Sequence, residues 1–137
     1  MLQRDYFIRI IEEFMAALGR FLEKKVDERT DEDLKELYRQ YVGSYDVLRN
    51  LSFDEIIKYS KEQWRPEERI NRLDMLAELL YAEGSYKTNP LRDMLLNKAY
   101  QLFDYVETNG NTFSLRRRQI MKEIGSSSPS LHNGKDA

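Results

Sequence analysis

Side chains that could do chemistry are few in this chain. It has one histidine, His132, and no cysteine. Nucleophilic catalysis by a Ser-His or Cys-His pair needs a positioned imidazole, and His132 lies in a stretch without hydrophobic periodicity. Without cysteine there are no disulfides and no thiolate metal ligands. We therefore expect a protein that is not an enzyme and uses no cofactor.

Carboxylates are plentiful, but their spacing does not indicate a metal site. The run Asp31-Glu32-Asp33 lacks the ligand spacing of a calcium loop, and negative charge is typical of the first turn of a helix. The neighbours Glu12 and Glu13 point about 100° apart on a helix. That separation is typical of a solvated face rather than of a shared ligand set.

The densest basic run, Arg116-Arg117-Arg118, is the candidate for contact with nucleic acid. Three consecutive helical residues spread over about 200°, so they do not form a single stripe for a phosphate backbone. The net charge of −2 adds no general attraction. We keep nucleic-acid binding as an alternative and expect this patch to pair with the acidic segment 27–36.

Hydrophobic spacing predicts an all-α fold with five to six antiparallel helices in one domain, residues 1–124. Helices are expected over 2–25, 31–42, 53–64, 66–84, 90–109 and 113–124, and residues 44–51 form a loop that can hold one helical turn. Ser52 and Glu55 form a capping box. Residues 125–137 contain one isolated leucine, so we predict a disordered tail.

The pair of helices at about 66–109 reads as a hairpin. Pro66 suits the first position of a helix, and Gly84 suits a left-handed residue that ends it. Asn89 as N-cap and Pro90 at N1 then begin a second helix, which ends at Gly110. The turn between them is short, so the helices are antiparallel neighbours.

Two segments of this sequence resemble known families. Leu76-Ala77-Glu78-Leu79-Leu80-Tyr81-Ala82-Glu83-Gly84-Ser85-Tyr86, followed by Lys98-Ala99-Tyr100-Gln101-Leu102-Phe103, resembles a tetratricopeptide-type helix pair with about three extra residues before Ala99. Leu2-Gln3-Arg4-Asp5-Tyr6-Phe7-Ile8-Arg9-Ile10-Ile11-Glu12 resembles the start of an uncharacterised bacterial family of small helical proteins with a tetratricopeptide-like C-terminal half. The resemblance implies a fold and a bacterial origin, and it implies no activity.

Surplus apolar and aromatic side chains point to binding of a protein. Tyr81, Tyr86 and Tyr100 near the hairpin turn are candidate partner-binding residues. Helix 2–25 carries more apolar surface than one packing partner needs, and Ile8 and Met15 at its edge are candidate dimer contacts. Alternatively, several other helices cover this helix, with the second or third lying on both residues and making them core.

The function that the sequence favours is a non-enzymatic helical protein–protein interaction module, and we expect a homodimer. Its partner is another protein or a second copy of itself. A small-ligand-binding helical domain is the remaining alternative. Charged residues interrupt the apolar N-terminus, so we predict neither a signal peptide nor a membrane segment and expect a cytoplasmic protein.

Overall fold

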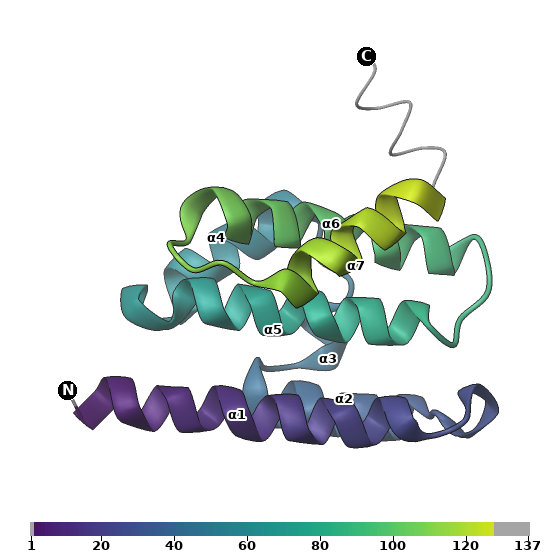
Figure 1. The fold of residues 1–137 in the computed structure, drawn as a ribbon, viewed down its shortest axis with the longest axis horizontal. Helices are drawn as coiled ribbons and strands as arrows, with labels where there is room; N and C mark the ends of the chain where they lie inside the picture. The colour runs from purple at the N-terminus through teal and green to yellow at the C-terminus, as the bar shows by residue number, and fades with distance from the viewer. Residues whose placement is uncertain (1, 128–137) are drawn as a thin grey trace, which may run out of the picture.

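The computed structural model describes residues 2–127, and within this range the chain is all-α (Figure 1). Seven α-helices and one short 3-10 helix follow one another along the chain. Their bounds are α1 Leu2–Glu23, η1 Val26–Glu28, α2 Asp31–Tyr41, α3 Tyr45–Leu48, α4 Phe53–Gln63, α5 Pro66–Gly84, α6 Leu91–Asn109 and α7 Leu115–Ser127. The count exceeds the predicted five to six because residues 45–48 form a separate helical turn.

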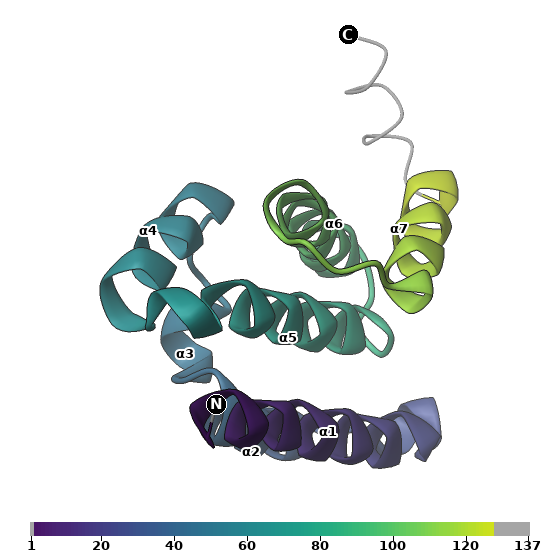
Figure 2. The ribbon, with the colours of Figure 1, turned by 60° about the vertical axis from the view of Figure 1, so that its left-hand side comes forward.

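The central element of the fold is α5, which packs against α1, α2, α4 and α6. Figure 2 shows α1 and α2 as a layer on one side of it, with α4, α6 and α7 on the other. Almost every residue in its second half is buried, in keeping with a helix enclosed on all sides. Helix α1 lies at the periphery instead and packs mainly against α2 and α5.

The hairpin of α5 and α6 makes the most extensive helix contact in the described chain. The prediction that Gly84 is left-handed is wrong, because Gly43 is the glycine with positive φ among the described residues. Gly84 is the last helical residue, and a Cβ there would lie 2.8 Å from Leu96 Cδ2. Its role is close approach of the two helices. Helix α6 begins at Leu91 with Pro90 as its N-cap residue, one position later than predicted, and Asn89 Oδ1 accepts a hydrogen bond from the Asp93 amide at 3.1 Å.

Local caps begin α2 and α4 and end α2 where the sequence places them. Ser52 Oγ accepts from the Glu55 amide at 3.2 Å, and Glu55 Oε1 accepts from the Ser52 amide at 2.9 Å, which confirms the capping box. Thr30 Oγ1 accepts from the Asp33 amide at 3.2 Å. Gly43 follows the end of α2 with φ +142°, a conformation that favours glycine.

The last helix extends further than predicted. It ends at Ser127, so the prediction of disorder is wrong for residues 125–127. Ile124 is buried, and a Cβ at Gly125 would lie 3.9 Å from the Tyr100 ring. Packing on α6 therefore continues the helix past a residue with poor helix propensity. Residues 128–137, including His132, lie outside the described residues.

Candidate interaction surface

One edge of α1 is apolar and faces away from the core. Ile8 is 44% exposed and Met15 is 36% exposed, so neither belongs to the core. The buried residues of α1 are Phe7, Phe14, Leu18 and Phe21, and their mean direction defines the core side of the helix. At about 100° per residue, Ile8 and Met15 point roughly 90–110° away from that core side. Half-buried Ile11 and Leu22 lie between these two directions, and Gly19 lies beside Met15. We call these five residues the open edge of α1: Ile8, Ile11, Met15, Gly19 and Leu22.

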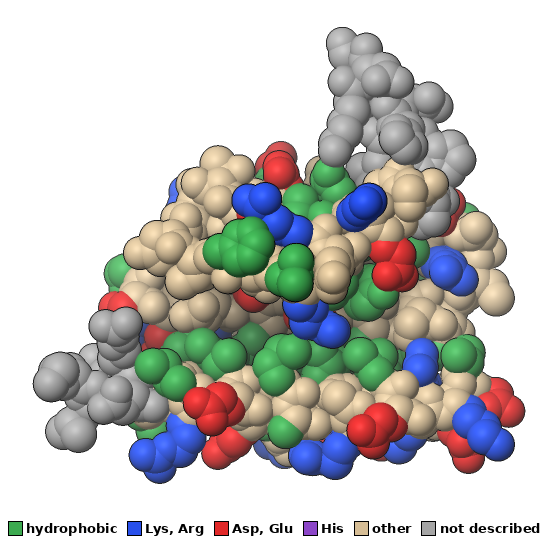
Figure 3. All heavy atoms as spheres, in the orientation of Figure 1, with side chains coloured by type: hydrophobic (Ala, Val, Ile, Leu, Met, Phe, Trp, Pro, Cys, Tyr) green, Lys and Arg blue, Asp and Glu red, His purple; other side chains and the backbone are tan. Residues whose placement is uncertain are grey.

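A second group of exposed apolar side chains lies at the start of α7. Phe113 is 70% exposed and Leu115 is 61% exposed. The Arg118 guanidinium lies 5.0 Å from the centre of the Phe113 ring. Figure 3 shows a row of hydrophobic side chains along α1, with a recess between that row and the layer that contains α7. An apolar strip beside a recess is a surface that an amphipathic helix can cover.

The three arginines of α7 are all ion-paired, but not with the acidic segment 27–36. Arg116 Nε donates to Glu78 at 2.7 Å, and Arg118 Nε donates to Glu107 at 3.1 Å. Arg117 Nε donates to Glu107 at 2.6 Å. The predicted pairing is wrong because α7 packs on α5 and α6, which supply the carboxylates. These ion pairs attach α7 to the hairpin.

The pKa values of the two carboxylates that contact Arg117, those of Asp74 and Glu107, shift in opposite directions. Arg117 is 3% exposed, and its Nη1 lies 3.4 Å from Asp74 Oδ2. Burial raises the pKa of Asp74 to about 6, against the opposing effect of Arg117. Burial also acts to raise the pKa of Glu107, but hydrogen bonds from Arg117 and Arg118 outweigh it and lower that pKa. The Arg117 guanidinium thus contacts two carboxylates, and it stabilises the charged form of Glu107 more than that of Asp74.

The candidate tyrosines do not converge on one site. The hydroxyl of Tyr81 donates to Glu123 of α7 at 2.9 Å, and Tyr100 lies next to Gly125 at the end of the same helix. The Tyr86 hydroxyl donates to Asp31 at the start of α2, on the other side of the hairpin. All three are half-buried and lie at contacts between helices.

A buried carboxylate that the sequence analysis did not single out joins α3 to α5. Glu83 is fully buried; Arg49 Nη2 donates to it at 2.8 Å and the Tyr45 hydroxyl at 2.9 Å. Burial, and then the hydrogen bond to Glu83, raises the pKa of Tyr45. The signal was present in the sequence, since Glu83 follows Leu80 by three residues on the apolar stripe. Because Glu83 has no exposed surface, its role is structural: it holds α3 against α5.

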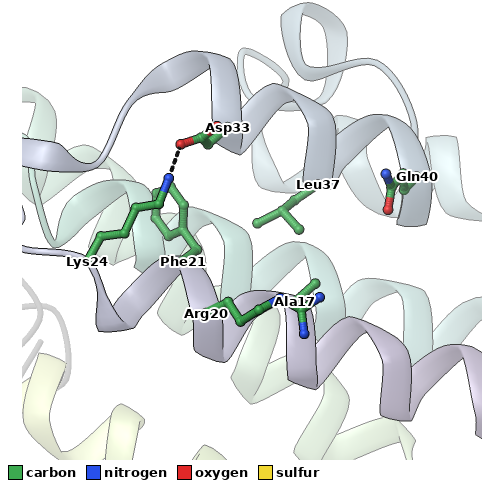
Figure 4. A pocket seen from close by; sticks show the side chains of 7 residues that line it. All are labelled: Ala17, Arg20, Phe21, Lys24, Asp33, Leu37 and Gln40. Atoms are coloured by element: carbon green, nitrogen blue, oxygen red, sulfur yellow. Dashed lines mark hydrogen bonds and ion pairs between the residues drawn. The ribbon is translucent and has the colours of Figure 1, made fainter.

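A shallow pocket of about 370 Å³ lies between α1 and α2 (Figure 4). Its apolar lining comes from Ala17, Phe21 and Leu37, and the Lys24–Asp33 ion pair spans one end. Nowhere in the described range do three or more His, Asp or Glu side chains gather to hold a metal ion. No helix in the same range is long and apolar enough to cross a membrane.

The arrangement is that of an all-α helical domain with an open apolar edge. Comparison with protein-family models, with curated proteins and with solved structures found no match. The resemblance to a tetratricopeptide-type pair and to a bacterial family therefore stays a prediction. The function has to be argued from the surface itself.

Proposed function

We propose that this protein is a non-enzymatic protein–protein interaction module that binds through the open edge of α1. The observation that supports this most directly is the exposure of Ile8 and Met15 on one side of α1, away from the side that carries its buried residues. A partner that covers both side chains adds to stability, since full burial of one such side chain contributes about 1.5–3 kcal/mol. A cytoplasmic location stays a prediction.

The two alternatives have less support from the geometry. Binding of nucleic acid through Arg116–Arg118 needs guanidinium groups free for phosphate, and all three are engaged with carboxylates. Binding of a small ligand needs a concave site that buries most of the ligand. The α1–α2 pocket is open and shallow, and an ion pair already occupies one end.

Site-specific photo-crosslinking tests the proposal because it captures whichever protein lies against a chosen residue. The full chain carries a photo-reactive phenylalanine analogue at Ile8 or Met15 and is irradiated in the cells that produce it. The matched control places the analogue at Met94, which is 61% exposed on α6. We expect a discrete protein adduct from positions 8 and 15, several-fold more abundant than from position 94. Absence of adducts at 8 and 15, or equal labelling at 94, overturns the proposal.

A further inference from the structure

A hollow of about 350 Å³ lies between the end of α2 and the start of α5, and it shares no residue with the open edge of α1. One wall is the last turn of α2, and the other is the junction of α4 and α5. Its lining includes one tryptophan, one tyrosine and three arginines: Trp64, Tyr41, Arg39, Arg65 and Arg72. Tryptophan, tyrosine and arginine are the residue types that carry most of the binding energy in protein interfaces. The composition therefore indicates a surface for another protein.

Both walls of the hollow are held in place by contacts within the chain. The Arg72 guanidinium of α5 donates to the Tyr41 carbonyl and so attaches the last turn of α2 to α5. On the other wall, Arg69 Nε donates at 3.0 Å to a carbonyl in the last turn of α4. The Trp64 ring packs edge-to-face on Tyr59, with 5.6 Å between the ring centres. A partner thus meets a surface that needs little ordering on binding, which favours affinity.

The lining of the hollow is positively charged, although the whole chain has a net charge of −2. Its one carboxylate, Glu68, pairs with Arg72 at 3.0 Å, which leaves the charges of Arg39 and Arg65. Among the described residues, no hydrogen bond or ion pair engages the Arg65 guanidinium. Arg39 pairs with Glu36, but the two side chains are 70% and 50% exposed, and water screens such a pair so that it contributes little. Two guanidinium groups are therefore available to carboxylates of a partner.

We propose that this hollow is a second interaction surface and binds a short acidic segment of a partner protein, with carboxylates on Arg39 and Arg65 and an apolar side chain against Trp64. Guanidinium groups bind carboxylates through two parallel hydrogen bonds, which give such contacts strength and direction. The indole ring of Trp64 is half-buried, so its exposed part can contact an apolar neighbour. An open hollow suits a peptide segment better than a small molecule, because a small ligand needs a site that encloses most of its surface. This surface goes beyond the proposed function, which concerns the open edge of α1.

The carboxylates around the hollow favour a short acidic segment over nucleic acid. Glu62 and Glu67 are exposed, and they flank residues 63–66 in the chain. A nucleic-acid strand carries a charge at every phosphate, so a strand that extends beyond the hollow meets repulsion from these two side chains. A peptide with two carboxylates and neutral ends matches the two available guanidinium groups without that repulsion.

The fluorescence of Trp64 tests the proposal directly, because this residue is the one tryptophan in the sequence. The full chain is titrated with a small set of capped peptides, each with two glutamates on either side of a leucine at different spacings. We expect at least one peptide to give a saturable change in emission, and raising the salt from about 50 to about 300 mM should weaken its binding several-fold.

Two matched probes serve as controls for the peptide that binds. The same peptide with glutamine in place of glutamate should bind much more weakly, since it keeps the leucine and lacks the charge. A single-stranded oligothymidylate of similar length should also bind more weakly. No saturable change with any acidic peptide, equal binding of the glutamine peptide, or tighter binding of the oligothymidylate overturns the proposal.

Variants of the chain then place the binding in this hollow. Arg65→Gln should raise the dissociation constant about fivefold, as expected for the loss of one exposed charge-assisted contact, and should leave the thermal midpoint unchanged. Arg39→Gln should weaken binding similarly, and Glu67→Gln should tighten it because it removes a repelling charge. The matched control is Arg92→Gln, at an exposed position of α6, which should leave the dissociation constant unchanged. Equal binding by the natural chain and Arg65→Gln, or an equal loss in Arg92→Gln, contradicts the proposal.

Discussion

Replacing Asp74 by asparagine should stabilise the protein at neutral pH. Its Oδ1 is buried with no hydrogen-bond partner, and its Oδ2 lies 3.4 Å from a guanidinium that Glu107 holds more closely. Burial raises the pKa of Asp74 to about 6 from a usual 3.8, so the folded state disfavours the charged form. The amide keeps the shape of the carboxylate and removes its charge.

The magnitude follows from the size and the sign of the shift. The folded pKa is above the unfolded one, so the folded state holds an extra proton between pH 4 and 6, and the penalty is complete above about pH 6. A shift of about two units corresponds to roughly 3 kcal/mol at most. The side chain is 32% exposed, and solvent screening about halves that figure. We expect Asp74→Asn to gain roughly 1–2 kcal/mol at pH 7.5.

Urea unfolding at a series of pH values measures this directly. The difference between Asp74→Asn and the natural chain should be largest at pH 7.5, shrink through pH 6 to 5, and vanish near pH 4. Asp104→Asn, at an exposed position of α6, is the matched control and should change little at any pH. A loss of stability in Asp74→Asn at pH 7.5 would refute this reasoning, because it would mean that the pair with Arg117 outweighs the burial of the carboxylate.

Two other contacts allow further predictions. Arg49→Met leaves the fully buried Glu83 without its main counter-charge and should cost about 3 kcal/mol in urea unfolding, and adding Glu83→Gln should restore at least half of it. A cost below about 1 kcal/mol would show that Glu83 does not depend on Arg49. Ser52→Ala removes the capping box of α4 and should lower stability by about 1 kcal/mol, whereas Ser126→Ala, near the end of α7, should have a smaller effect.

Local signals in the sequence were sufficient for the fold class and for most helix boundaries. Thr30 and Ser52 cap the helices that follow them, and Gly43 ends α2, because these effects depend on residues a few positions apart. Gly84 shows the limit of such reasoning. Its position after an apolar helix suits a left-handed cap, but the approach of Leu96 from another helix explains it.

Only the tertiary structure decided which side chains meet across the chain. The partners of Arg116 and Arg117 are 38 and 10 residues away, on α5 and α6, and no local pattern specifies such pairs. The sequence determined that α1 carries more apolar surface than one neighbour needs. Whether Ile8 and Met15 are core or surface depended on which helices cover α1, since burial belongs to the packing of elements rather than to one helix.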